Sequence, residues 1–197
     1  IRNTLVIALG SVAGAGICGT TLAVALSRYR FPGSRILAGL AYLPFTLPPL
    51  VGVLAFYYLI GKGGFIARCC EQILGLPDMV IDGPWAILLI HTYSFYVFFY
   101  AMVGPALANL DRSQLEAART LGASRIRVLF RVTLPLLRPS IMGASLLTFM
   151  SSCASFSAPY FFADRFPVLS VAIYTERNQN NQSAAITLTV ILALISL

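Results

Sequence analysis

A polar, arginine-rich segment separates two long apolar stretches of this chain. Residues 111–135 read DRSQLEAARTLGASRIRVLFRVTLP, between the apolar stretches Gly83–Leu110 and Pro139–Ala163. Extended to residue 138, the segment holds six arginines against only Asp111 and Glu116. Such a segment belongs in water, whereas each flanking stretch is long enough to cross a bilayer. The segment therefore predicts a chain that leaves the membrane here and then re-enters it.

The composition is that of a membrane protein. Of 197 residues, 58% are hydrophobic and 11% charged, whereas about 25% of a soluble domain is charged. About 20 apolar residues cross a hydrocarbon core of roughly 30 Å. Four uncharged stretches reach that length, and a fifth is apolar but shorter: Asn3–Ser27, Ile36–Gly61, Gly83–Leu110 and Pro139–Ala163, then Ser183–Leu197. Because backbone groups in lipid must bond within their own segment, we predict an all-α membrane bundle of about five helices.

The net charge of +7 lies on alternate connections. Arg28, Arg30 and Arg35 lie between the first two stretches, and the six arginines of residues 111–138 lie between the third and fourth. This placement argues against a nucleic-acid partner and follows the positive-inside rule. We therefore expect residues 28–35 and 111–138 to be cytoplasmic, with the bilayer as the chain's surroundings.

The other two connections, residues 62–82 and 164–182, are nearly balanced in charge and are expected outside. This alternation puts residue 1 outside and directs residue 197 inward. Because no translocation signal precedes residue 1, we expect at least one further span upstream. The chain then reads as a single transmembrane domain, residues 1–197, within a longer protein or as half of a duplicated one.

The polar segment itself predicts a short helix. Ser113 and Glu116 have the spacing of a capping box, and Gly122 stands where a glycine ends a helix in a left-handed turn. A helix of about two turns does not persist alone in water, so it must dock against something. Pro135 and Pro139 mark the return to the membrane, since proline is tolerated near a helix start. A capping box alone leaves open that Glu116 only caps its own helix.

The pattern Glu116-Ala117-Ala118, then Gly122, then Leu134-Pro135, resembles the EAA loop of ABC importer permeases. Val132 stands where that family often has Ile. The resemblance extends to Asn3-Thr4-Leu5, to Leu22-Ala23 with Arg28, to Pro44 with Pro48-Pro49-Leu50-Val51-Gly52, and to Leu107-Ala108-Asn109-Leu110-Asp111.

Membership of that family would imply a type I importer fold in the bacterial cytoplasmic membrane. Two permease subunits or halves would line one pathway, above two cytoplasmic ATPase subunits and below an external substrate-binding protein. The short helix would be the coupling helix, with Glu116, Ala117, Ala118 and Gly122 docking in the ATPase and Arg119 and Arg125 beside them. This chain would bind no cofactor, and ATP and Mg²⁺ would belong to the ATPase. The chain has no phosphate-binding G-x-x-x-x-G-K-[ST] motif of its own.

Polar residues and prolines inside the spans are candidates for the translocation pathway. Pro44, Pro48 and Pro49 interrupt the second stretch and predict either a simple kink or a hinge in a discontinuous helix. His91 is the single ionisable group within a span; it either bonds a neighbouring helix or handles substrate or protons. Five further residues in the fourth stretch either pack helices closely or line the path: Ser151, Ser152, Ser155, Ser157 and Tyr160.

Two other classes of protein fit less well. An ion-coupled secondary transporter often places acidic residues at mid-membrane, but none of the four full-length stretches contains Asp or Glu. A membrane-embedded enzyme needs converging nucleophiles, bases or metal ligands. One histidine and four scattered cysteines provide neither these nor a metal-ligand spacing.

Residues 155–160, with Thr175 and Glu176, resemble permeases for iron(III), polyamines or the oxyanions thiosulfate and sulfate.

Overall fold

The computed structural model describes residues 1–29, 31–74, 81–111, 113, 118, 120–163 and 166–197. These described residues form helices and no β-strand. The helices are α1 (Arg2–Arg28), α2 (Ser34–Leu40), α3 (Leu43–Thr46), α4 (Pro49–Ile60), α5 (Phe65–Leu74), α6 (Gly83–Ala108), α8 (Arg125–Val128), α9 (Leu134–Leu136), α10 (Arg138–Ala154), α11 (Ser157–Phe162), α12 (Leu169–Asn178) and α13 (Gln182–Ser196). A π-helical turn, Leu129–Thr133, joins α8 to α9.

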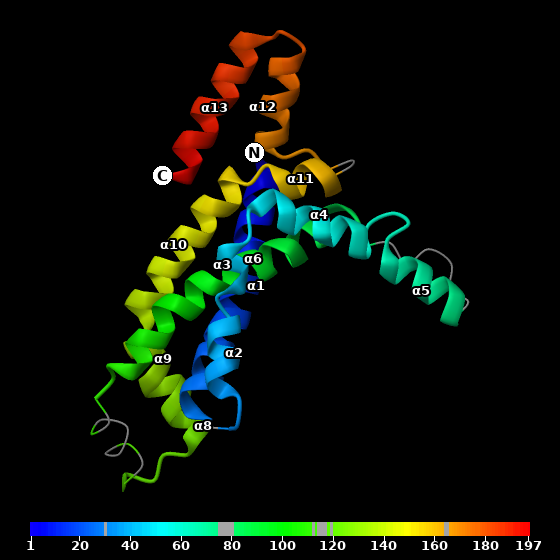
Figure 1. Ribbon diagram of the computed structural model, residues 1–197. Coiled ribbons are helices and arrows are strands. Elements are labelled where there is room, and N and C mark those ends of the chain that lie inside the picture. The colour runs from blue at the N-terminus through cyan, green and yellow to red at the C-terminus, as the bar shows by residue number, and fades with distance from the viewer. Residues whose placement is uncertain (30, 75–80, 112, 114–117, 119, 164–165) are drawn as a thin grey trace.

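Three long helices, α1, α6 and α10, pack together at the centre of the fold (Figure 1). Glycines on α1 let α6 come close. A β carbon at Gly14 would collide with the hydroxyl of Thr92, and one at Gly19 would collide with the backbone oxygen of Tyr96. Small residues serve this purpose in membrane bundles, because lipid provides no hydrophobic force that drives helices together.

Two of the predicted spans are single helices and two are not. Helices α1 and α6 match the first and third stretches to within two residues at each end, and both are long and apolar enough to cross a membrane. The second stretch is discontinuous, since residues 34–46 and 49–60 meet at 102°. The fourth stretch, Pro139–Ala163, was expected to be one helix and this was wrong, because α10 ends at Ala154 and α11 begins at Ser157. Counting each bent pair as one span gives up to four spans among the described residues.

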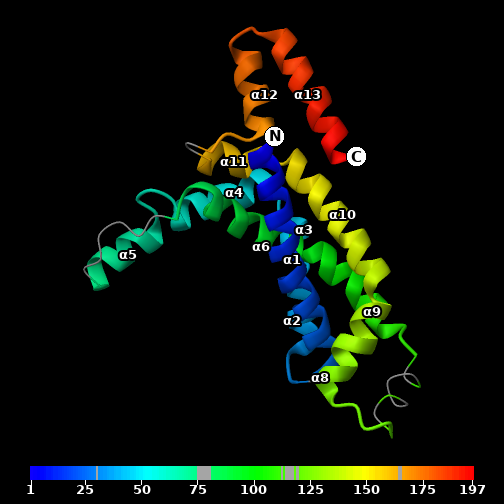
Figure 2. The ribbon, with the colours of Figure 1, turned by 180° about the vertical axis from the view of Figure 1, so that it is seen from behind.

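Helices α12 and α13 form an antiparallel hairpin at one end of the molecule (Figure 2). The connection 164–182, which was expected outside, contains α12. The hairpin is tied to the start of α1, where Thr4 Oγ1 accepts from the Leu169 N–H at 3.0 Å and Asn3 Nδ2 donates to the Pro167 carbonyl at 3.0 Å.

Both arginine-rich connections lie at the opposite end. The α1–α2 connection and the start of α8 are neighbours there in both views, far from the N-terminus and from α12 (Figures 1 and 2). The serial crossing predicted from the charge pattern requires this arrangement. Re-entry occurs where Pro135 and Pro139 are the second residues of α9 and α10, as predicted, with a bend of 66° between residues 126–136 and α10.

Candidate functional site

A first helix break lies between α3 and α4. Leu47 is extended, with ψ of 131°, because the ring of the following proline disfavours the helical region. Pro48 and Pro49 lack backbone N–H groups, so they cannot continue the hydrogen bonds of α3, but Pro49 is well placed as the first residue of α4. Of the two alternatives left by the sequence, the structure has the discontinuous helix, with Pro44 one turn before the break.

A second break lies between α10 and α11, at Ser155 and Phe156. Ser155 leaves the helical region with ψ of 125°. Pro159, four residues later, has no N–H to donate to the Ser155 carbonyl. That carbonyl instead accepts from Ser170 Oγ of α12 at 2.8 Å. We call residues Ser155 and Phe156 the α10–α11 joint.

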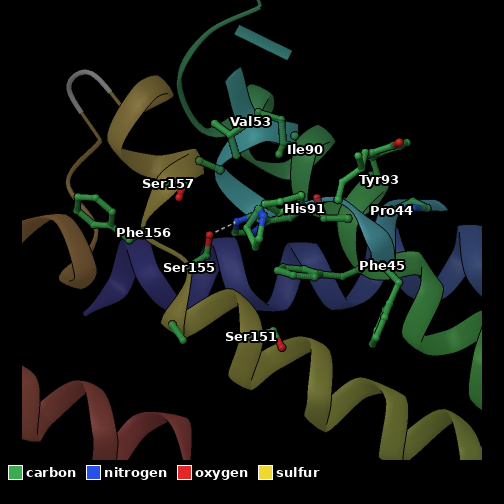
Figure 3. A pocket seen from close by; sticks show the side chains of 18 of the residues that line it. Pro44, Phe45, Val53, Ile90, His91, Tyr93, Ser151, Ser155, Phe156 and Ser157 are labelled. Carbon is green, nitrogen blue, oxygen red and sulfur yellow. Dashed lines mark hydrogen bonds between the residues drawn. The ribbon is translucent and has the colours of Figure 1, made fainter. Parts of the chain in front are cut away.

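The two breaks enclose a pocket of about 540 Å³ against the middle of α6 (Figure 3). Prolines and aromatic rings form much of its wall, with Phe45 from α3 and Phe156 from the joint. Its polar lining consists of hydroxyls and one imidazole: Tyr93, Ser94, Ser151, Ser155, Ser157 and His91. No charged side chain lines it within the described part of the chain. A ligand in this pocket would meet neutral hydrogen-bonding groups.

His91 is buried at the back of the pocket and contacts three other segments. Its Nδ1 lies 2.9 Å from Ser11 Oγ on α1 and 3.1 Å from Ser152 Oγ on α10. Its Nε2 lies 2.9 Å from Ser155 Oγ at the joint. One side chain on α6 therefore links α1, α10 and the α10–α11 joint. The interhelical hydrogen bond expected for His91 is present, and the residue also lines the pocket.

We assign the donors and acceptors around His91 from the bonds that its neighbours make. No charged group acts on the ring among the described residues, and a buried unpaired charge is unfavourable, so the ring is neutral with one N–H. Ser11 Oγ donates to the Ile7 carbonyl at 2.6 Å, so it accepts from Nδ1–H. Ser152 Oγ donates to Ser11 Oγ at 3.2 Å. Nε2 is then an acceptor, and the Ser155 hydroxyl donates to it.

The structure brings together four of the six residues proposed for the pathway. Ser151, Ser155, Ser157 and His91 line the pocket, whereas Ser152 is buried at the contact of α10 with α1. Tyr160 lies outside the pocket, half-exposed and packed against Phe156 and Tyr174.

Sequence reasoning missed three polar participants, Tyr93, Ser94 and Ser11. Ser94 follows His91 by three residues, so both lie on one helix face, and this spacing was a usable signal. Ser11 had no such signal, because only the packing of α1 on α6 brings it to the imidazole.

The arginine-rich segment is partly described. Glu116, Ala117 and Arg119 lie outside the described residues, as does the side chain of Arg125. Ala118 and Thr120 are helical, and Gly122 has φ of +80°, as predicted for a glycine that ends a helix. The Ala123 N–H donates to the Ala118 carbonyl at 3.1 Å, which is the defining bond of a Schellman motif.

The start of this helix differs from the prediction. Ser113, expected as the capping residue, is itself helical, and its N–H donates to Asp111 Oδ1 at 2.9 Å. Asp111 therefore accepts from the second residue after it, as a capping side chain does. The N–H and hydroxyl of Ser113 hold the pKa of the Asp111 carboxyl below its usual value. The expected bond from Glu116 lies outside the described residues.

Comparison with known proteins identifies the family. Residues 15–197 match the family described as "Binding-protein-dependent transport system inner membrane component". The chain belongs to this family. It is therefore a multi-pass membrane protein of a family of transport components.

Two curated relatives are similar over most of this chain. It is 32% identical over 175 residues to the sulfate transport system permease protein CysT of Salmonella typhimurium, which covers 86% of this chain and 62% of CysT. It is 34% identical over 187 residues to the molybdenum transport system permease protein ModB of Escherichia coli K12, which covers 91% of this chain and 81% of ModB. The chain thus spans less than two thirds of the length of CysT.

Solved structures share the fold. A chain of a bacterial ABC transporter that imports the acidic polysaccharide alginate superposes with a TM-score of 0.75 at 19% identity, over all of this chain and 74% of that one. A chain of the MetNI methionine ABC transporter, in inward-facing conformations, superposes with a TM-score of 0.68 at 18% identity, over 98% and 88%. The predicted all-α, type I importer permease fold is confirmed.

Proposed function

We propose that this chain is the transmembrane permease component of an ATP-driven importer in the bacterial cytoplasmic membrane. It forms half of the translocation pathway with a second permease subunit or half, and an external binding protein delivers the substrate. ATP and Mg²⁺ bind separate cytoplasmic ATPase subunits, and this chain needs no cofactor. The match of residues 15–197 to the family is the observation that carries the proposal. Ion-coupled transport is less favoured, since α1, α4, α6, α10 and α11 contain no Asp or Glu.

In this proposal the arginine-rich segment receives the ATPase. Glu116, Ala117, Ala118 and Gly122 dock in the ATPase, with Arg119 and Arg125 beside them. The left-handed turn at Gly122 supports this role, because it ends a helical segment three residues before α8, and α8 lies at the molecule's arginine-rich end. The same segment runs through α8 and the π-helical turn into α10, which carries one wall of the pocket.

The substrate class that we propose is a small oxyanion such as sulfate or molybdate. Two similar proteins support this class, because CysT is named as a sulfate permease protein and ModB as a molybdenum permease protein. The pocket is consistent with it, because hydroxyls donate hydrogen bonds to anions, whereas hard cations prefer carboxylate ligands and none lines this pocket within the described residues. This favours the oxyanion over iron(III) or a polyamine among the alternatives left by the sequence. The pocket is then part of the translocation pathway, with Pro48 and Pro49 at its hinge.

Transport by the reconstituted complex tests the proposal. Proteoliposomes that contain the full permease and its ATPase, supplied with the binding protein, should take up labelled sulfate or molybdate only when ATP and Mg²⁺ are present. Uptake that follows an ion gradient without ATP would instead support the secondary transporter. Uptake of iron(III) or a polyamine, but of neither oxyanion, would overturn the substrate class and leave the importer assignment intact.

Variants of Glu116 test the ATPase contact. Truncating one partner of a buried charged contact weakens an interface by about 2–5 kcal/mol, so Glu116→Ala should insert normally yet bind the ATPase at least tenfold more weakly. Glu116→Gln keeps the hydrogen-bonding shape but not the charge. Recovery with Gln would assign a role in shape, and a persistent defect would assign a role to the charge. Normal transport and normal ATPase retention in both variants would remove Glu116 from the interface.

A further inference from the structure

The hydroxyl of Ser155 lies between His91 and the interior of the pocket. Ser155 Oγ lies 2.9 Å from His91 Nε2 at the back of the pocket, and it is the donor when the imidazole proton is on Nδ1. The side chain of Ser155 also lines the pocket (Figure 3). A serine hydroxyl has one proton to donate. An anionic ligand that accepts a hydrogen bond from Ser155 must therefore replace His91 as the acceptor.

The other pocket hydroxyls are not committed in this way. Within the described part of the chain, Ser94, Ser151 and Ser157 have no hydrogen-bond partner for their hydroxyls, and all three line the pocket. They can turn toward a ligand without breaking a bond. Ser155 alone among the pocket serines has to exchange one partner for another.

The bond that would be exchanged holds the α10–α11 joint to the core of the bundle. His91 is anchored at its other nitrogen to α1 and α10, through Ser11 and Ser152. The backbone of the joint is held separately, by Ser170 Oγ of α12 on the Ser155 carbonyl. Loss of the bond to Nε2 therefore removes the hydrogen bond between the joint and α6, while the bond of the joint to α12 remains.

We infer that the Ser155–His91 hydrogen bond is a latch on the α10–α11 joint, which an oxyanion in the pocket opens by accepting the Ser155 hydroxyl. Only rotation of the hydroxyl is needed, and no proton leaves oxygen or nitrogen. A hydrogen bond to an anion is shorter and stronger than one to a neutral nitrogen, so the exchange is favoured when the pocket is filled. The absence of charged side chains from the described pocket lining keeps the site weak, as a transit site must be. This inference rests on the proposed oxyanion substrate.

The single histidine of the chain makes the latch observable. The assembled transporter is prepared with [¹⁵N]histidine in the full permease, and the His91 signals are assigned by their loss in His91→Phe. Loss of a donor changes the chemical shift of an unprotonated ring nitrogen. Saturating sulfate or molybdate should move the Nε2 signal to the position found in ligand-free Ser155→Ala, and leave the Nδ1 signal in place.

Two serine variants separate the latch from general effects of the pocket. In Ser155→Ala the Nε2 signal should no longer respond to either anion, and the anion concentration for half-maximal uptake should rise by roughly tenfold. In Ser157→Ala, which removes a pocket hydroxyl that does not touch His91, the Nε2 response at saturating anion should persist. Loss of the response in Ser157→Ala as well would overturn the assignment to Ser155.

The outcomes distinguish this inference from the proposed function. Uptake of either anion with an unmoved Nε2 signal would overturn the latch and leave the importer assignment intact. Uptake of neither anion would overturn the substrate class, and the latch with it. A moved Nε2 signal in the wild type, absent from Ser155→Ala and retained in Ser157→Ala, establishes the latch.

Discussion

Gly19 on α1 lies against the backbone carbonyl of Tyr96 on α6, so closely that a β carbon at Gly19 would collide with the Tyr96 oxygen. Backbone atoms cannot turn away as a flexible side chain can. Gly19→Ala should therefore push α1 and α6 apart, loosen the centre of the bundle, and lower the yield and the melting temperature of the purified protein.

Gly104 provides the matched control for this packing prediction. It is also a helical glycine, on α6, but a β carbon there would meet no atom within 4 Å among the described residues. Gly104→Ala should be neutral or slightly stabilising, because alanine favours helix by about 1 kcal/mol over glycine. Equal behaviour of the two variants would mean that the α1–α6 contact does not depend on Gly19.

The left-handed turn at Gly122 should matter for coupling. With φ of +80°, this position strains a β-branched residue by roughly 1–2 kcal/mol, although a β carbon there meets no described neighbour. Gly122→Val should insert normally and lose substrate uptake. Asparagine tolerates the left-handed region, so Gly122→Asn should keep most of the uptake. Normal uptake by Gly122→Val at normal expression would show that the left-handed turn is not needed to position the coupling segment.

The sidedness of the molecule is open to a labelling test. Ser124 is exposed in the arginine-rich segment, and Gln179 is exposed at the turn between α12 and α13. In a background without the native cysteines, Ser124→Cys should react with an impermeant maleimide only after permeabilisation. Gln179→Cys should react in intact spheroplasts. The reverse pattern would invert the predicted topology.

Filling the pocket should block transport without unfolding the protein. Ser151 lines the pocket and is half-buried, so Ser151→Leu places three further carbon atoms into the space. We expect uptake to fall at least tenfold at unchanged expression. The neighbouring Met150 is exposed and lies outside the pocket lining, so Met150→Leu should leave uptake unchanged. Full uptake by Ser151→Leu would show that substrate does not pass through this pocket.

The local chemistry of the chain determined much of what could be predicted. Apolar length identified the spans, arginine placement gave the alternation of connections, and the helix end at Gly122 followed from the conformational freedom of glycine. These signals act over a few residues or over one membrane thickness. They can therefore be recognised in the sequence without knowing which other segments pack nearby. The capping residue was misassigned by two positions, since Asp111 and Ser113 both can cap and only the backbone geometry distinguishes them.

The site was decided by contacts between segments far apart in the sequence. The break at Ser155 depends on two residues. Pro159 has no N–H for the Ser155 carbonyl, and Ser170 Oγ of α12 donates a hydrogen bond to that carbonyl instead. The position of His91 between Ser11 and Ser155 depends on glycines that bring α1 against α6. A hydroxyl in an apolar span bonds whichever partner the packing supplies, because lipid offers none. The sequence by itself therefore determined which segments cross the membrane, and only the tertiary structure decided which hydroxyls meet around the one imidazole.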